Sequence, residues 1–179
     1  KKTLLSFEIL PPLKGESIES IYKTIDPLIE FKPSFINVTY HREEIVYKKR
    51  ELGLLEKKTV RKRPGTVAIS TAIKYKYGLE VVPHIICGGF TIEETENALI
   101  DLHFLDITNL LVIRGDVPKT EKYFTPEPNG HAHAVELVSQ IMNMNKGIYS
   151  DEELENKTPT NFSVGVAGYP EKHIESPNM

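Results

Sequence analysis

The stretch Asn109-Leu-Leu-Val-Ile-Arg-Gly-Asp116 decides the fold, because it sets an apolar run directly before an arginine, a glycine and a carboxylate. The run is too short for an ordinary helix, and its bulky aliphatic side chains are typical of a strand buried on both faces. Charged groups therefore stand at the carboxyl end of a buried strand. Ligands bind at that end in parallel α/β proteins, so the stretch predicts a functional site.

The composition is that of a globular protein. With 179 residues, 40% hydrophobic and 26% charged, the chain is long enough for a core, and we expect a single domain over 1–179. A net charge of -3 gives no general attraction to nucleic acid. No apolar run could span a bilayer, and Cys87 is the single cysteine. We therefore expect a cytoplasmic protein without nucleic-acid or membrane partners.

Segments typical of strands and helices alternate about five times along the chain. The predicted strands cover 3–10, 35–40, 79–87, 109–113 and 162–167, and the predicted helices cover 16–31, 66–77 and 133–144, with another that follows a capping box at Thr91 and Glu94. This alternation predicts a parallel sheet with right-handed crossovers. Five such units could form a doubly wound sheet, whereas a closed barrel of eight needs roughly 250 residues. We therefore expect that the chain is incomplete at its C-terminus.

Two polar segments interrupt the alternation. Residues 41–64 are highly charged and include Lys48-Lys49-Arg50 and Arg61-Lys62-Arg63. They are typical of a solvated insertion or a mobile lid, and the alternative is a segment that captures an anionic group of a dinucleotide. Residues 149–160 are acidic and polar, which predicts a mobile surface insertion.

The predicted strand ends carry side chains that could act together. If these ends meet at one barrel mouth, carboxylates, imidazoles, hydroxyls and a guanidinium surround one pocket and could move protons. Glu8 stands out, because a carboxylate buried on a strand is costly unless it is paired or neutralised. Arg114 and Asp116 could instead simply pair with each other. The candidates are Glu8, Thr39, Tyr40, His84, Arg114, Gly115, Asp116, Tyr169 and His173.

The sequence contains no motif typical of a metal or Rossmann site. It has no His-Glu-x-x-His, no pair of cysteines, no P-loop and no Gly-x-Gly-x-x-Gly turn. His131 and His133 stand two apart at a predicted helix start, so they should point to different faces. We expect no metal site.

Five blocks of the chain resemble the flavin-dependent methylenetetrahydrofolate reductase family in their letters, order and spacing. The resemblance implies a (β/α)8 TIM barrel, here a partial barrel of about five β/α units. It also implies FAD as cofactor, NAD(P)H as hydride source, reduction of methylenetetrahydrofolate to methyltetrahydrofolate for methionine synthesis, and a homo-oligomer. The blocks are Ser6-Phe-Glu-Ile-Leu-Pro-Pro12, Phe35-Ile-Asn-Val-Thr-Tyr40, Pro83-His84, Leu111-Val-Ile-Arg-Gly-Asp116 and Val166-Ala-Gly-Tyr-Pro-Glu-Lys-His173.

The resemblance also implies roles for single residues. Glu8 matches the glutamate that supplies a proton when the folate ring opens, a role that burial beside apolar neighbours would favour. Asp116 matches the aspartate that approaches the flavin and the pterin. Gly115 would let the cofactor approach the backbone. The residues that resemble the family's FAD contacts are Thr39, His84, Arg114, Gly115, Asp116, His133, Ala134, Ala167, Tyr169 and His173.

The chain departs from the family pattern at three places. His41 opens the basic insertion where a small, glycine-rich turn is usual, and His133 stands where a tyrosine commonly touches the cofactor. Strands six to eight are missing, so we expect these 179 residues alone to be inactive. Two alternatives are therefore a non-catalytic flavin or folate binding subunit that needs a partner chain, and another flavin barrel oxidoreductase of the proline dehydrogenase type.

Overall fold

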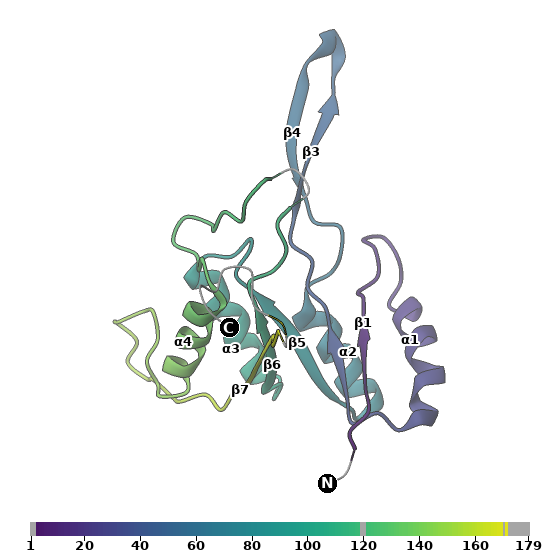
Figure 1. Ribbon diagram of the computed structural model, residues 1–179, viewed down its shortest axis with the longest axis vertical. Coiled ribbons are helices and arrows are strands. Elements are labelled where there is room, and N and C mark those ends of the chain that lie inside the picture. The colour runs from purple at the N-terminus through teal and green to yellow at the C-terminus, as the bar shows by residue number, and fades with distance from the viewer. Residues whose placement is uncertain (1–2, 119–120, 170, 172–179) are drawn as a thin grey trace.

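A five-stranded parallel sheet forms the centre of the computed structural model, which describes residues 3–118, 121–169 and 171 (Figure 1). The strands lie in the order β1-β2-β5-β6-β7, and each pairs in parallel with the next. The predicted alternation of strands and helices is confirmed. The bounds are β1 (Ser6–Ile9), α1 (Glu19–Ile25), β2 (Phe35–Val38), α2 (Thr66–Tyr77), β5 (Glu80–Ile86), α3 (Ile92–Phe104), β6 (Asn109–Ile113), α4 (Ala134–Met144) and β7 (Ser163–Val166).

The core lies between one face of the sheet and the helices. Successive strand residues point to opposite faces, so Ile36, Val38 and Val112 all lie on the face that the helices bury. Helix residues such as Leu99 and Ile141 complete this core. The opposite face is only half-buried and borders a cavity of about 560 Å³ lined by Phe35, Asn37, Val82, Leu111 and Gly165, among others.

The predicted helix over 16–31 is shorter than expected. The α-helix covers Glu19–Ile25 and continues as a 3-10 helix, η1, over Asp26–Phe31. Pro27 lies at the start of η1. Proline has no N–H to donate to the carbonyl four residues before it, which explains why the α-helical hydrogen-bond pattern ends there.

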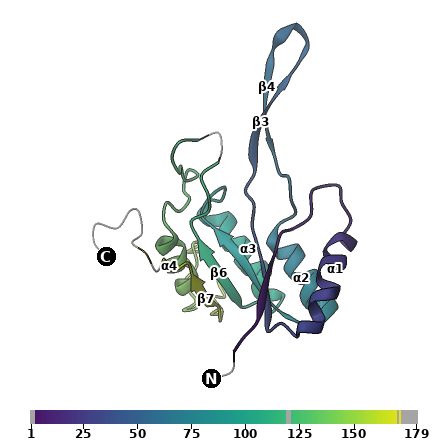
Figure 2. The ribbon, with the colours of Figure 1, turned by 45° about the vertical axis from the view of Figure 1, so that its right-hand side comes forward.

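The insertion 41–64 forms a β-hairpin that the sequence did not predict. Strands β3 (Glu44–Lys49) and β4 (Leu55–Val60) pair antiparallel around a short 3-10 turn, η2 (Glu51–Gly53). The hairpin projects away from the main sheet, as two views agree (Figure 2). Most of its side chains are exposed, so no buried face imposes the apolar alternation by which a strand is recognised.

The other predicted local features are present. The Thr91 hydroxyl accepts from the Glu94 N–H at 3.1 Å and the Glu94 carboxylate accepts from the Thr91 N–H at 2.9 Å, which confirms the capping box. The polar segment after α4 is a surface loop, joined to α3 where the Ser150 N–H donates to Glu96 at 2.7 Å. No helix in the described ranges has the length and apolar character needed to cross a bilayer.

Candidate active site

The carboxyl ends of β6 and β7 meet the start of α4 around one cavity of about 540 Å³. Residues far apart in the sequence come together here, because the ends of parallel neighbouring strands share one edge of the sheet. The structure thus places seven predicted site residues in one cavity wall. They are Arg114, Gly115, Asp116, His133, Ala134, Ala167 and Tyr169.

Gly115 occupies a position that only glycine fits well. Its φ is +88°, and a Cβ added there would lie 3.2 Å from Cδ1 and 3.3 Å from Cβ of Ile86. The expected reason for this glycine was a close approach of the cofactor. The structure adds a different reason, since both the backbone conformation and the packing against Ile86 require it.

Arg114 is tied to its surroundings through both side chain and backbone. Its guanidinium lies over the Phe124 ring at 5.3 Å from the ring centroid. Its carbonyl accepts hydrogen bonds from the N–H groups of Cys87 and Gly88 at 3.2 and 3.3 Å. The strand end that carries Asp116 is therefore fixed to the end of β5.

A second cavity of about 240 Å³ adjoins the first. Gly115 and Asp116 line both cavities, and the second is completed by Tyr40, His41 and Arg42 from the beginning of the insertion. Burial and the nearby Arg63 charge lower the pKa of His41, while Asp116 opposes that shift. Tyr40 was a predicted candidate. The sequence did not identify His41 and Arg42 as part of the site, although their place just after β2 was a usable signal.

Arg42 brings buried hydrogen-bond donors to this second cavity. Only 17% of its side chain is exposed, and one nitrogen lies 3.8 Å from carboxylate oxygens of both Glu121 and Glu127. Its Nε and Nη1 atoms are buried and make no hydrogen bond within the described part of the chain. Such donors are costly to bury, so they suit a polar or anionic ligand atom.

Glu8 and His84 form a separate pair on the half-buried face of the sheet. The Glu8 Oε2 lies 3.6 Å from the His84 Nε2, and the two side chains are 59% and 7% exposed. The predicted burial of Glu8 is therefore wrong, because β1 is an outer strand of the sheet and nothing described covers this side chain. Burial lowers the pKa of His84, and the Glu8 charge opposes this shift. The net effect favours the uncharged imidazole over the charged one.

Thr39, like Glu8 and His84, lines neither of these two cavities. The Thr39 hydroxyl is bonded to the Ile9 carbonyl at 3.2 Å, and it lies 3.4 Å from the His41 ring. His173 lies outside the described residues. The structure therefore does not place Glu8, Thr39 and His84 in the same cavity wall as Asp116.

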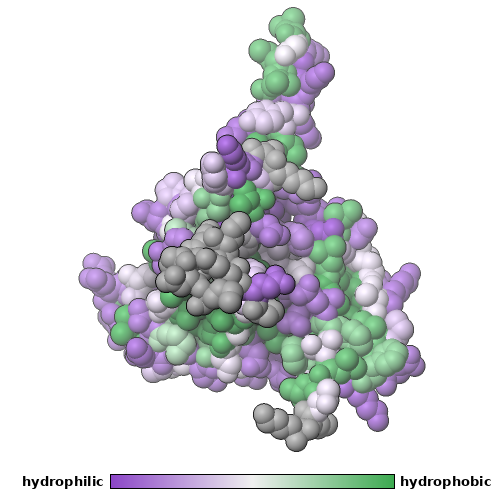
Figure 3. Space-filling model, in the orientation of Figure 1, coloured by the Kyte–Doolittle hydropathy of each residue, from purple (hydrophilic) through white to green (hydrophobic). Residues whose placement is uncertain are grey.

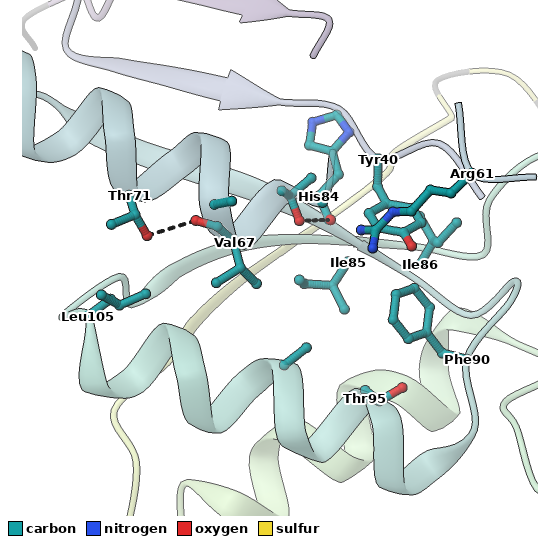
Figure 4. Close-up of a pocket in the computed structure, with 14 residues that line it drawn as sticks. Tyr40, Arg61, Val67, Thr71, His84, Ile85, Ile86, Phe90, Thr95 and Leu105 are labelled. Atoms are coloured by element: carbon teal, nitrogen blue, oxygen red, sulfur yellow. Dashed lines mark hydrogen bonds between the residues drawn. The ribbon is translucent and has the colours of Figure 1, made fainter. Parts of the chain in front are cut away.

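A further cavity of about 420 Å³ lies between α2 and α3, on the other side of β5. The His84 imidazole points out of it, while the His84 carbonyl accepts from the Thr66 hydroxyl at 3.5 Å (Figure 4). This cavity is mostly apolar, with Val67, Ile85 and Leu105 in its lining. It shares Tyr40 and Ile86 with the second cavity described above.

Neither the histidines near α4 nor the cysteine forms a reactive cluster. His131 is buried against Gln140 at 2.7 Å, whereas His133 starts α4 in a capping box with Glu136. Burial raises the pKa of the Cys87 thiol to about 11. No group of three potential metal ligands occurs among the residues that the structure covers.

The fold and the cavities define a parallel α/β protein with a candidate site at the carboxyl ends of its strands. Comparison with known families gives a match to Methylenetetrahydrofolate reductase over residues 1–179. The chain belongs to the methylenetetrahydrofolate reductase family.

Similar proteins occur in fungi, plants and bacteria. The chain is 29% identical over 178 residues to Methylenetetrahydrofolate reductase 2 of Saccharomyces cerevisiae, covering 99% of this chain and 25% of that protein. It is 27% identical over 172 residues to Methylenetetrahydrofolate reductase (NADH) 1 of Arabidopsis thaliana, covering 96% and 24%. It is 28% identical over 176 residues to 5,10-methylenetetrahydrofolate reductase of Escherichia coli, covering 96% and 46%. The chain thus spans 24% to 46% of the length of these relatives.

Proposed function

We propose that the chain is part of an FAD-dependent enzyme that reduces 5,10-methylenetetrahydrofolate to 5-methyltetrahydrofolate with NAD(P)H. The product would feed methionine synthesis in the cytoplasm, and the parallel sheet would be five strands of a (β/α)8 barrel. The observation that carries the proposal is the gathering of seven predicted cofactor contacts around one cavity at the strand ends, of which only His133 departs from the residue usual in the family. Membership of the reductase family supports it.

The residues present fit a large polar cofactor. Two cavities adjoin across Gly115 and Asp116, and the second contains the Arg42 donors that have no hydrogen bond within the described residues. Nε2 of His84 is another buried atom without a hydrogen-bond partner there. When bound, FAD would accept hydride from NAD(P)H and pass it to the folate. Arg114, Gly115, Asp116, His133, Ala134, Ala167 and Tyr169 would hold it, with Thr39, His84 and His173 as further contacts.

Glu8 would supply the proton that opens the folate ring. Its carboxyl group is accessible to a substrate on the half-buried face of the sheet, and it lies 3.6 Å from a buried imidazole. Burial lowers the pKa of this imidazole, which disfavours a positive charge on His84 beside the carboxyl group. Asp116, between the two cavities, would orient the folate by hydrogen bonds.

The two alternatives are not favoured. A non-catalytic binding subunit and a proline dehydrogenase-type enzyme would both be compatible with a flavin barrel. The family match and the relatives above carry the reductase name instead.

The test uses the full-length enzyme and measures two half-reactions separately by anaerobic rapid mixing: reduction of the flavin by NADH, and its reoxidation by methylenetetrahydrofolate. We expect Glu8→Gln to retain bound flavin and its bleaching by NADH, and to slow its reoxidation by methylenetetrahydrofolate at least about 100-fold. Glu30→Gln, at an exposed position remote from the strand ends, is the matched control. Loss of both half-reactions in Glu8→Gln would contradict the proton role, and a full chain that binds no flavin would contradict the proposed function.

A further inference from the structure

The β3–β4 hairpin, here called the arm (residues 44–60), is an extended structure with little support from the body. Its strands pair only with each other, and neither joins the five-stranded sheet. The base is attached, since the Lys14 N–H donates to the Lys62 carbonyl at 2.7 Å and Arg63 donates to the Pro11 carbonyl. A lone two-stranded hairpin is marginally stable in water. A second surface that covers the outer part of the arm would therefore stabilise it.

The outer half of the arm combines apolar and basic side chains. Leu52 is 98% exposed, and Tyr47, Leu54 and Leu55 are each more than 60% exposed. The space-filling view shows hydrophobic and hydrophilic residues side by side at the tip of the arm (Figure 3). In the hairpin register Tyr47 faces Lys57 and Lys49 faces Leu55. Strand residues two apart share a face, so all four side chains lie on one face of the arm.

The charge of the arm region is opposite to that of the remaining chain. Residues 41–64 contain nine Lys or Arg and four Asp or Glu, a formal charge of +5. The whole chain has a charge of -3, so the rest has a charge of -8. Such asymmetry favours association between the arm of one copy and the body of another.

The loop after α4 offers a surface of matching chemistry. Residues 151–155, here called the acidic loop, are Asp-Glu-Glu-Leu-Glu, with four acids in five residues. Leu154 is 38% exposed and nearby Ile148 is 55% exposed. Acidic and apolar side chains thus lie together here, and they complement the basic and apolar side chains on the face of the arm. In both ribbon views the acidic loop lies beside α4 and the arm tip points away from the body, so the two cannot meet within one copy.

We propose that the arm docks on the acidic loop of a second copy of this chain, and that reciprocal docking closes a dimer. Leu52 at the tip and Leu55 would lie against Leu154 and Ile148, while Lys49 and Lys57, on the same face as Leu55, would face the acids. A two-fold arrangement uses each contact twice and leaves no unpaired arm. This inference is independent of the proposed catalytic function.

Charge reversal on both surfaces tests the docking by sedimentation velocity of the full chain at micromolar concentration. We expect a dimer for the native protein. Lys49→Glu/Lys57→Glu and Glu152→Lys/Glu153→Lys should each weaken it at least about tenfold, since like charges then face each other. An equimolar mixture of the two variants should restore the dimer, because both contacts regain opposite charges. Glu30→Lys/Asp101→Lys, at exposed acids elsewhere, should leave it unchanged.

Three outcomes would overturn the proposal. One is a native protein that stays monomeric, and another is a dimer that both double reversals leave intact. The third is a monomer whose arm binds vesicles containing anionic phospholipid, with binding lost in Lys49→Glu/Lys57→Glu. Restoration in the mixture excludes misfolding of either variant as the cause of a loss.

Discussion

Replacing Gly115 by alanine would test how tightly the end of β6 is packed at the candidate site. At φ +88° a side chain costs about 1–2 kcal/mol. The new Cβ would also lie 3.2–3.3 Å from two atoms of Ile86, which is only 4% exposed. Crowding of this kind adds about 1 kcal/mol. We therefore expect Gly115→Ala to lower the free energy of unfolding by about 2–3 kcal/mol.

Gly78→Ala is the matched control, measured by urea unfolding of the full chain. Gly78 also has a positive φ, +64°, but a Cβ there would meet nothing within 4 Å, so this variant should lose about 1–2 kcal/mol. Ile86→Val removes the closest atom, and should therefore be less costly in the Gly115→Ala background than alone. Two results would refute the packing argument. One is an equal loss of unfolding free energy in the two glycine variants, and the other is an Ile86→Val loss that is the same with and without Gly115→Ala.

Two further predictions concern β7 and the pH dependence of folding. Asn145 accepts from the Phe162 N–H at 2.8 Å and donates to the Phe162 carbonyl at 2.9 Å. Asn145→Ala should therefore lower the free energy of unfolding in urea by about 2–4 kcal/mol. The control is Asn161→Ala at an exposed position, and a smaller loss in Asn145→Ala than in this control would contradict the prediction. Burial depresses the pKa of His84 below 6.5, so the unfolded chain binds the proton more readily. The free energy of unfolding should then fall as the pH drops from 7 to 5.5, and it should fall less in His84→Gln. An equal pH dependence of the unfolding free energy in the native protein and in His84→Gln would contradict this prediction.

The parallel sheet could be predicted because its signals are local. The apolar run before Arg114 and the capping box at Thr91 each depend on neighbouring residues, and the structure contains both features. The gathering of Asp116 and Ala167 followed from a general rule about parallel strand ends. The break at Pro27 could also have been predicted from the sequence, since proline lacks the N–H that the next α-helical hydrogen bond needs.

The missed features depend on contacts between distant residues. The exposure of Glu8 depends on which strands flank β1, and a single strand sequence does not contain that information. Arg42 lies beside Glu121 only because two loops meet. Asn145 holds Phe162 across the polar loop, although asparagine at a helix end is ordinary in sequence. Long-range polar contacts have no periodic pattern, so they appear only in the folded chain.

The order of the main sheet has a consequence for synthesis on the ribosome. Apart from the arm, the strands lie side by side in the order in which they are made. Each emerging strand can therefore add to the edge left by the strand before it, and no later strand must insert between two that are already paired. The nascent chain can gain structure from its N-terminus onward. At every stage, however, the most recent strand is an open edge, and this is where a stalled chain would recruit a neighbour.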